Sequence, residues 1–259
     1  MRVIPGIVIC TLILLVISCN STNGEQASEK EAAVEIDQAQ SLVDEMIAYH
    51  GGEAYPQSNI SFTFRGRAYT ALKGESGFQY TREYVDKEDR SISDKLTGEG
   101  FMRKKDGEEE ALSAKDSAKY ANSLNSVVYF AYLPYGLNDP AVNKEYVGQA
   151  TLNDQKLNKV KVTFQQEGGG KDFDDTYVYW LDAETHQLMY LAYEFHVDDG
   201  GLRFRVANNV RRVGEILFAD YINYKAELGQ FSVFELDKAF EEGKLDSLSE
   251  IRLENVEVN

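Results

Sequence analysis

The chain has 259 residues, and its 27 Lys and Arg against 43 Asp and Glu give a formal net charge of −16 at pH 7. This acidity excludes a nucleic-acid binder, because phosphates require a basic surface, and it disfavours a protein that lies flat on an anionic bilayer. The two cysteines, Cys10 and Cys19, both lie close to the start of the chain, so the remainder has neither a disulfide nor a thiol nucleophile.

Residues 1–18 are predicted to be a secretory signal peptide. Arg2 precedes an apolar run from Ile7 to Ile17, which is short for a membrane span. The run ends in Val16-Ile17-Ser18-Cys19, which resembles the lipobox of bacterial lipoproteins. That resemblance implies cleavage before Cys19 and lipidation of Cys19, and two or more acyl chains anchor a protein stably. We therefore expect a lipoprotein of the cell envelope that faces the periplasm, and Asn20 after the cysteine favours the outer membrane.

Residues 19–28 are predicted to be the lipidated cysteine and a flexible polar tether, and residues 29–259 a single domain. The domain opens with a helix, because apolar side chains recur every three or four residues. They include Ile36, Val43, Met46 and Ile47. Gly51-Gly52 ends this helix, since glycine accepts the left-handed conformation that follows a helix C-terminus.

The pattern then changes to a period of two, which is typical of antiparallel strands with one solvated face. Strands are predicted over 60–69 and 78–84, with a hairpin around Asp106-Gly107. A second helix follows from Ala114 to Tyr132, capped by Ser113 and ended by Pro134. Asp139-Pro140 predicts the start of a short helical turn.

The remainder is predicted to be a β-meander with strands near 146–152, 156–165, 176–181, 187–196, 202–210 and 214–224. A short helix from Leu236 to Phe240 and a last strand from Ile251 to Val258 complete it. Residues 176–181 and 187–196 are apolar or aromatic on both faces, so both faces of those strands must be covered.

Several motifs carry a resemblance to a known group of proteins. They are His50-Gly51-Gly52, Tyr129 to Pro134, Asp174 to Trp180, Tyr190 to Tyr193 and Gly200 to Arg205. Together they resemble an uncharacterised Gram-negative lipoprotein family related to the LolA/LolB-like superfamily of periplasmic lipoprotein carriers. The resemblance implies an α+β fold, an incomplete antiparallel β-barrel (half-barrel) around a helical plug or lid, with an apolar cavity that holds acyl chains.

One end of the meander is predicted to be acidic. Alternating turns bring Asp172, Asp174, Asp175, His196, Asp198 and Asp199 to one rim, beside Arg203 and Arg205, which would neutralise these acids. Carboxylates suit calcium, but the spacing is not that of a calcium loop, and Asp and Gly are ordinary turn formers. No metal and no other cofactor is therefore predicted.

Aromatic residues supply the candidate ligand site. Phe62, Phe64, Phe78 and Tyr80 are predicted to face inward on neighbouring strands, beneath the helix that bears Val43, Met46 and Ile47. The competing interpretation is ordinary cross-strand and core packing.

We expect a lipid-anchored protein that binds or carries a lipid or another amphiphile. One alternative is a non-catalytic envelope protein with a solid core that meets an unknown protein partner. A metal-dependent hydrolase at the acidic rim ranks last, because the sequence has no catalytic motif such as Gly-x-Ser-x-Gly or His-Glu-x-x-His. A cavity between helix and sheet would favour the carrier, and a filled core the interaction protein.

Overall fold

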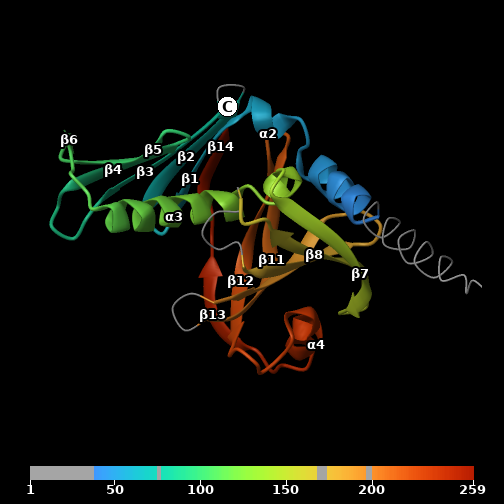
Figure 1. Cartoon of the computed structure of the whole chain (residues 1–259). Coiled ribbons are helices and arrows are strands. Elements are labelled where there is room, and N and C mark those ends of the chain that lie inside the picture. Colours follow the sequence, from blue (N-terminus) through green and yellow to red (C-terminus); the bar gives the residue numbers. More distant parts are fainter. Residues whose placement is uncertain (1–37, 75–76, 168–173, 197–199) are drawn as a thin grey trace, which may run out of the picture. The chain divides into compact units, whose positions relative to one another are not determined.

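Two antiparallel sheets form the framework of the computed structural model, which describes residues 38–74, 77–167, 174–196 and 200–259 (Figure 1). The predicted signal peptide, Cys19 and the tether lie outside these residues. The three apolar clusters of the described residues all lie within one compact unit, residues 35–259.

The first sheet has the strand order β14-β1-β2-β3-β4-β5-β6. Its strands are β1 (Asn59–Phe64), β2 (Arg67–Gly74), β3 (Gly77–Val85), β4 (Ser91–Thr97), β5 (Gly100–Lys105), β6 (Glu108–Glu109) and β14 (Glu254–Val258). The predicted hairpin is confirmed, because Asp106 and Gly107 both have positive φ between β5 and β6. Such a pair forms the tight turn that matches the twist of a hairpin.

The second sheet has the order β13-β12-β11-β10-β9-β8-β7. Its strands are β7 (Val142–Leu152), β8 (Gln155–Phe164), β9 (Thr176–Asp182), β10 (Leu188–Phe195), β11 (Gly201–Val213), β12 (Ile216–Ala226) and β13 (Asp246–Ile251). Successive strands pair in order, as the predicted meander requires.

The C-terminal strands join the two sheets. β13 pairs with β12 in the second sheet, whereas β14 pairs with β1, the first strand of the domain in sequence, in the first sheet. The single last strand predicted over 251–258 is therefore wrong. Asp220 explains the break, since its carboxylate accepts a hydrogen bond from the backbone N–H of Leu253 at 2.9 Å, between the two strands.

The helix over residues 38–50 packs on the second sheet. Ala39, Val43 and Met46 are fully buried, and they share one apolar cluster with Val160, Tyr179 and Leu191. The helix ends as predicted at Gly51, whose φ of 148° favours glycine. After it come a short helix, α2 (Ala54–Gln57), and the first strand.

Helix α3 (Ala114–Ala131) packs on the first sheet instead. Leu124, Val128 and Ala131 are buried against Ile60 and Phe62, with Tyr80 in the same cluster. The predicted cap is confirmed, because the Ser113 hydroxyl accepts a hydrogen bond from the Asp116 N–H at 3.1 Å. A 3₁₀ turn, η1 (Tyr135–Asn138), follows α3. Asp139 thus ends a helical turn and does not start one, which corrects the prediction for Asp139-Pro140.

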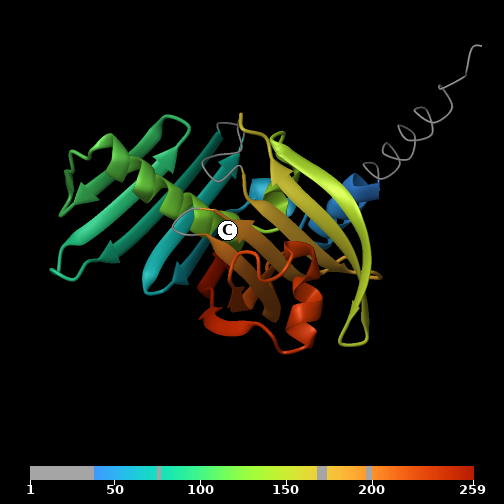
Figure 2. The ribbon, with the colours of Figure 1, turned by 60° about the horizontal axis from the view of Figure 1, so that its bottom comes forward.

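A third layer covers the outer face of the second sheet. It consists of η2 (Val233–Glu235) and α4 (Leu236–Glu241), as Figure 2 shows. Leu236 packs there with Trp180 and Phe204. Asp237 is buried beside them and accepts hydrogen bonds from Trp180 Nε1 at 3.0 Å and from Lys159 Nζ at 3.1 Å. The expected cover on both faces of β9 and β10 is confirmed, with the 38–50 helix on one side and α4 on the other.

The predicted α+β half-barrel is confirmed. Neither sheet closes on itself, and helix α3 lies on the inner face of the first sheet, where its buried side belongs to the same cluster as Ile216 and Phe218 of β12.

Candidate functional site

Helix α3 is the centre of the candidate site, because a cavity lies on each side of it. A buried charge cluster holds the helix on the sheet. Arg82 of β3 donates two hydrogen bonds to Asp94 at 2.6 and 2.8 Å, and a third to Ser123 of α3 at 3.0 Å. Arg103 of β5 also binds Asp94, at 2.6 and 2.9 Å, and its guanidinium stacks 3.6 Å from the centre of the Tyr120 ring. These contacts fix α3 over the first sheet, whose inner face is polar where β3, β4 and β5 lie under the helix.

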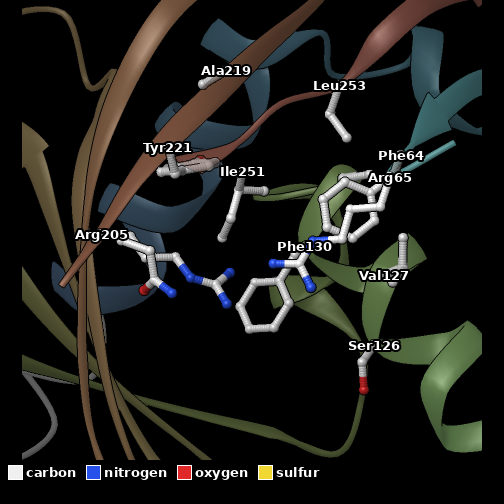
Figure 3. A pocket seen from close by; sticks show the side chains of 12 residues that line it. Phe64, Arg65, Ser126, Val127, Phe130, Arg205, Ala219, Tyr221, Ile251 and Leu253 are labelled. Carbon is white, nitrogen blue, oxygen red and sulfur yellow. The ribbon is translucent and has the colours of Figure 1, made fainter. Parts of the chain in front are cut away.

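The smaller cavity lies between α3 and the strands β11, β12 and β13, and its volume is about 230 Å³. Figure 3 shows its walls. Most of the lining is apolar and comes from α3, from the end of β1 and from β12 and β13. It includes Phe64, Val127, Phe130, Tyr221, Ile251 and Leu253. Four non-consecutive parts of the sequence thus build one apolar wall.

The polar residues of this lining are Arg65, Ser126, Arg205 and Asn223. Arg205 and Asn223 are the buried ones. They are directly opposite each other on β11 and β12, and they are 7% and 6% exposed. Arg205 Nη2 donates a hydrogen bond to the Tyr193 hydroxyl at 2.9 Å, and its guanidinium lies 3.9 Å from the Phe130 ring centre. The Arg205 Nε and the Asn223 Oδ1 have no hydrogen-bond partner among the described residues. Two buried side chains, each with an unpartnered polar atom, therefore line a mainly apolar cavity.

The larger cavity lies on the other side of α3 and measures about 780 Å³. Its lining is aromatic, with Phe78, Tyr80, Tyr129, Tyr132, Tyr135 and Phe164. Burial raises the pKa of Tyr129 to about 12, so its phenol stays protonated at neutral pH. This cavity is also more polar than the first, because Lys73 and Asp139 contribute to it.

Lys73 is the basic residue of the larger cavity. Its ammonium lies 4.9 Å from the Tyr135 ring centre and 5.7 Å from that of Tyr132. Burial lowers the pKa of Lys73, and the negative charge of Asp139 partly opposes this effect. Aromatic rings around an ammonium stabilise its charge, and Asp139 supplies a neighbouring negative charge, so Lys73 has a counter-charge within the protein.

The structure divides the residues predicted to bind a ligand. Phe64 lines the smaller cavity, and Phe78 and Tyr80 line the larger one. Phe62 lines neither, since it is 2% exposed and stacks on Tyr69 with ring centres 5.2 Å apart.

The helix predicted to cover these aromatic residues is the wrong one. Val43, Met46 and Ile47 belong to the cluster on the second sheet, and α3 covers Phe62 and Tyr80. Both helices have an apolar stripe of the right period, and a period does not specify which sheet a helix meets. None of Val43, Met46 and Ile47 lines either cavity beside α3.

The predicted acidic rim is described only in part, because Asp172, Asp198 and Asp199 lie outside the described residues. Within the described ranges, no group of three or more His, Cys, Asp or Glu side chains is arranged to hold a metal ion. Arg205 does not neutralise acids at the rim, since it is buried at the smaller cavity. Arg203 donates to the carbonyl of Leu202 at 2.9 Å.

The histidines do not form a catalytic group with one another. His50 is buried in the protein and accepts a hydrogen bond from the Leu188 N–H at 3.1 Å. His186 contacts Glu45 at 2.9 Å, and His196 contacts Glu194 at 3.7 Å.

Sequence reasoning missed Arg205, Asn223 and Lys73 as cavity residues. A charged residue within a strand indicates a solvated face unless the pairing is known. The one available signal was the position of Arg205 between Phe204 and Val206, in a meander whose neighbouring strand is apolar on both faces.

Comparison with known proteins identifies the family. A family model matches residues 6–253. The chain belongs to DUF6503, a family of unknown function. Among curated proteins, no match is found for this DUF6503 member.

Several solved structures are similar to this chain over most of its length. A LolA superfamily protein from Nitrosomonas europaea matches with a TM-score of 0.45 and 10% identity, over 85% of this chain and 91% of its own. A putative outer membrane lipoprotein-sorting protein domain from Vibrio parahaemolyticus gives 0.42 and 10%, over 80% and 99%. A DUF1329 family protein from Desulfovibrio piger gives 0.46 and 10%, over 87% and 93%. At these scores we draw nothing about ligands or partners from them.

In the part of the DUF6503 chain that the structure describes, no helix is both long and apolar enough to cross a membrane.

Proposed function

We propose that this protein binds an amphiphile beside α3 and carries or presents it at the periplasmic face of a bacterial membrane. The observation that carries the proposal is the pair of cavities that flank α3, of about 230 and 780 Å³, lined mainly by aromatic and aliphatic side chains. Ligand sites are typically concave, mostly apolar and furnished with a few placed polar groups.

The alternative of a protein with a solid core fits the second sheet better than the first. Tyr179, Trp180 and Leu181 of β9 are fully buried and line neither cavity. The space beside α3 is different, because Phe64, Phe78 and Phe130 are only partly buried. Open apolar walls favour a carrier over an interaction protein.

Lipidation of Cys19 would hold this domain at a membrane, with the polar residues 20–28 as a short tether. Metabolic labelling with a fatty acid tests this part. Wild-type protein is expected to be labelled, whereas the Cys19→Ser variant should remain unlabelled and unprocessed, because Cys19 is the expected acceptor. Label retained in Cys19→Ser would exclude anchoring through Cys19.

Binding is tested with a chain of residues 20–259 and a fluorescent fatty acid. We expect saturable uptake with one or two sites, and displacement by unlabelled fatty acid. The matched pair of variants is Phe64→Ala, at a cavity wall, and Leu236→Ala, in the packed cluster beneath α4. Uptake should weaken in the first and persist in folded samples of the second. No saturable uptake by the wild-type domain would exclude the carrier.

A further inference from the structure

We propose that the smaller cavity recognises the anionic head of its ligand, with Arg205 as the head-group residue and Asn223 as its partner. This inference rests on the proposed function and specifies its ligand class: an amphiphile whose charged head carries a hydroxyl or amide N–H next to it.

Arg205 has no counter-ion among the residues that the structure describes. The other Lys and Arg side chains that are buried in the described chain each contact a carboxylate, namely Arg82 and Arg103 with Asp94, and Lys159 with Asp237. Arg205 is equally buried, and among the described residues its polar contact is the neutral hydroxyl of Tyr193. A buried unpaired charge is unfavourable, so an anion in the cavity would complete the site.

Two polar atoms of opposite character, both unpartnered among the described residues, belong to neighbouring lining residues. Arg205 Nε is a donor and Asn223 Oδ1 is an acceptor, and both are without a hydrogen-bond partner. The amide nitrogen of Asn223 is directed elsewhere, to the Ser249 hydroxyl at 3.4 Å. Because the two residues are directly opposite on neighbouring strands, their side chains are within reach of one head group.

The rest of the cavity is mainly apolar. Phe64, Val127 and Ile251 offer an apolar wall that suits an alkyl chain and would exclude a hydrated ion. Figure 3 shows Arg205 and Arg65 extending from different walls toward Phe130. Arg65 is exposed and its guanidinium lies 5.1 Å from the Phe64 ring centre, so it stands at the solvent side. An anion that approaches the cavity therefore passes the positive charge of Arg65 before it reaches that of Arg205.

The experiment compares two fluorescent probes that differ only in head charge, dansylaminoundecanoic acid and its methyl ester, on residues 20–259. Arg205→Met keeps an unbranched, flexible side chain and removes the charge. Arg203→Met is the matched control, because Arg203 is on the same strand and face but does not line the cavity. Acetate tests whether a head without a chain competes.

We expect Arg205→Met to weaken binding of the acid by at least about tenfold, the effect of losing one charge-assisted hydrogen bond, with little change for the ester. Arg203→Met should change neither, and acetate should not displace the probe. The melting temperature of Arg205→Met should be retained or raised, because the variant removes an unpaired buried charge.

A second comparison tests Asn223. β-Hydroxydodecanoate should compete with the acid probe better than dodecanoate does in wild type, and this advantage should vanish in Asn223→Leu.

Equal effects of Arg205→Met on acid and ester would overturn the head-group assignment while leaving the carrier intact. A lowered melting temperature of Arg205→Met with an unchanged ratio of acid to ester affinity would also overturn the assignment, because it would show that the role of Arg205 is structural. Displacement by acetate would replace the amphiphile with a small anion. Failure of both probes to bind wild type would instead reject the proposed function itself.

Discussion

Phe62 and Phe64 provide a sensitive test of whether the space beside α3 is open. They are neighbours on one face of β1, but Phe62 is 2% exposed and stacked on Tyr69, whereas Phe64 is partly buried and lines the smaller cavity. Phe62→Ala should therefore lower the free energy of unfolding by about 3–5 kcal/mol, as for a fully packed Phe. Phe64→Ala should lower it by roughly 1–2 kcal/mol, because the part of the ring that faces the cavity has no protein atoms to lose.

Urea unfolding of residues 20–259 at pH 7 measures both variants. With a slope of about 2 kcal/mol per molar urea, the midpoint should fall by roughly 1.5–2.5 M for Phe62→Ala and by about 0.5–1 M for Phe64→Ala. Uptake of a fluorescent fatty acid should weaken in Phe64→Ala. Equal losses of stability in the two variants would show that Phe64 is packed as tightly as Phe62, and would refute an open cavity at this wall.

Two further predictions concern stability. Asp94→Ala should lower the free energy of unfolding by about 3–5 kcal/mol, because it leaves Arg82 and Arg103 buried without a counter-charge. The control Glu145→Ala removes an exposed ion pair with Lys161 and should lower it by at most about 1 kcal/mol. Similar losses of the two variants in denaturant unfolding would contradict this expectation. Burial lowers the pKa of His50 to about 4 from 6.5, so the unfolded chain binds more protons between these pH values, and stability falls as the pH drops from 6.5 toward 4. The free energy of unfolding should fall by on the order of 3 kcal/mol in that window. His50→Gln should lack this pH-dependent loss. Parallel pH profiles of stability for the wild type and His50→Gln would show that His50 does not titrate as described.

The sequence predicted most local elements, because their signals are local. The single strand predicted over 60–69 is wrong, since Arg65 and Gly66 both have positive φ and form the turn of a hairpin between β1 and β2. The α3 stripe, its Ser113 cap and the Asp106-Gly107 turn all depend on side chains within a few residues of one another. The alternation along β8 also places Val160 and Val162 on the buried face.

The sequence did not predict which surfaces meet. The pairing of β14 with β1 joins residues close to opposite ends of the domain, and no local pattern encodes it. For the same reason the aromatic residues of the first sheet were assigned to the wrong helix. Arg205 was expected at a solvated rim. Its burial was not predictable from local sequence, because it depends on the neighbouring strands and on Phe130 of α3.

Native mass spectrometry of residues 20–259, purified without detergent, tests the carrier most directly. The account predicts a population whose mass exceeds that of the bare chain by one amphiphile, lost on extraction with organic solvent and restored by an added fatty acid. A single species with the mass of the bare chain, before and after addition of a fatty acid, would contradict it.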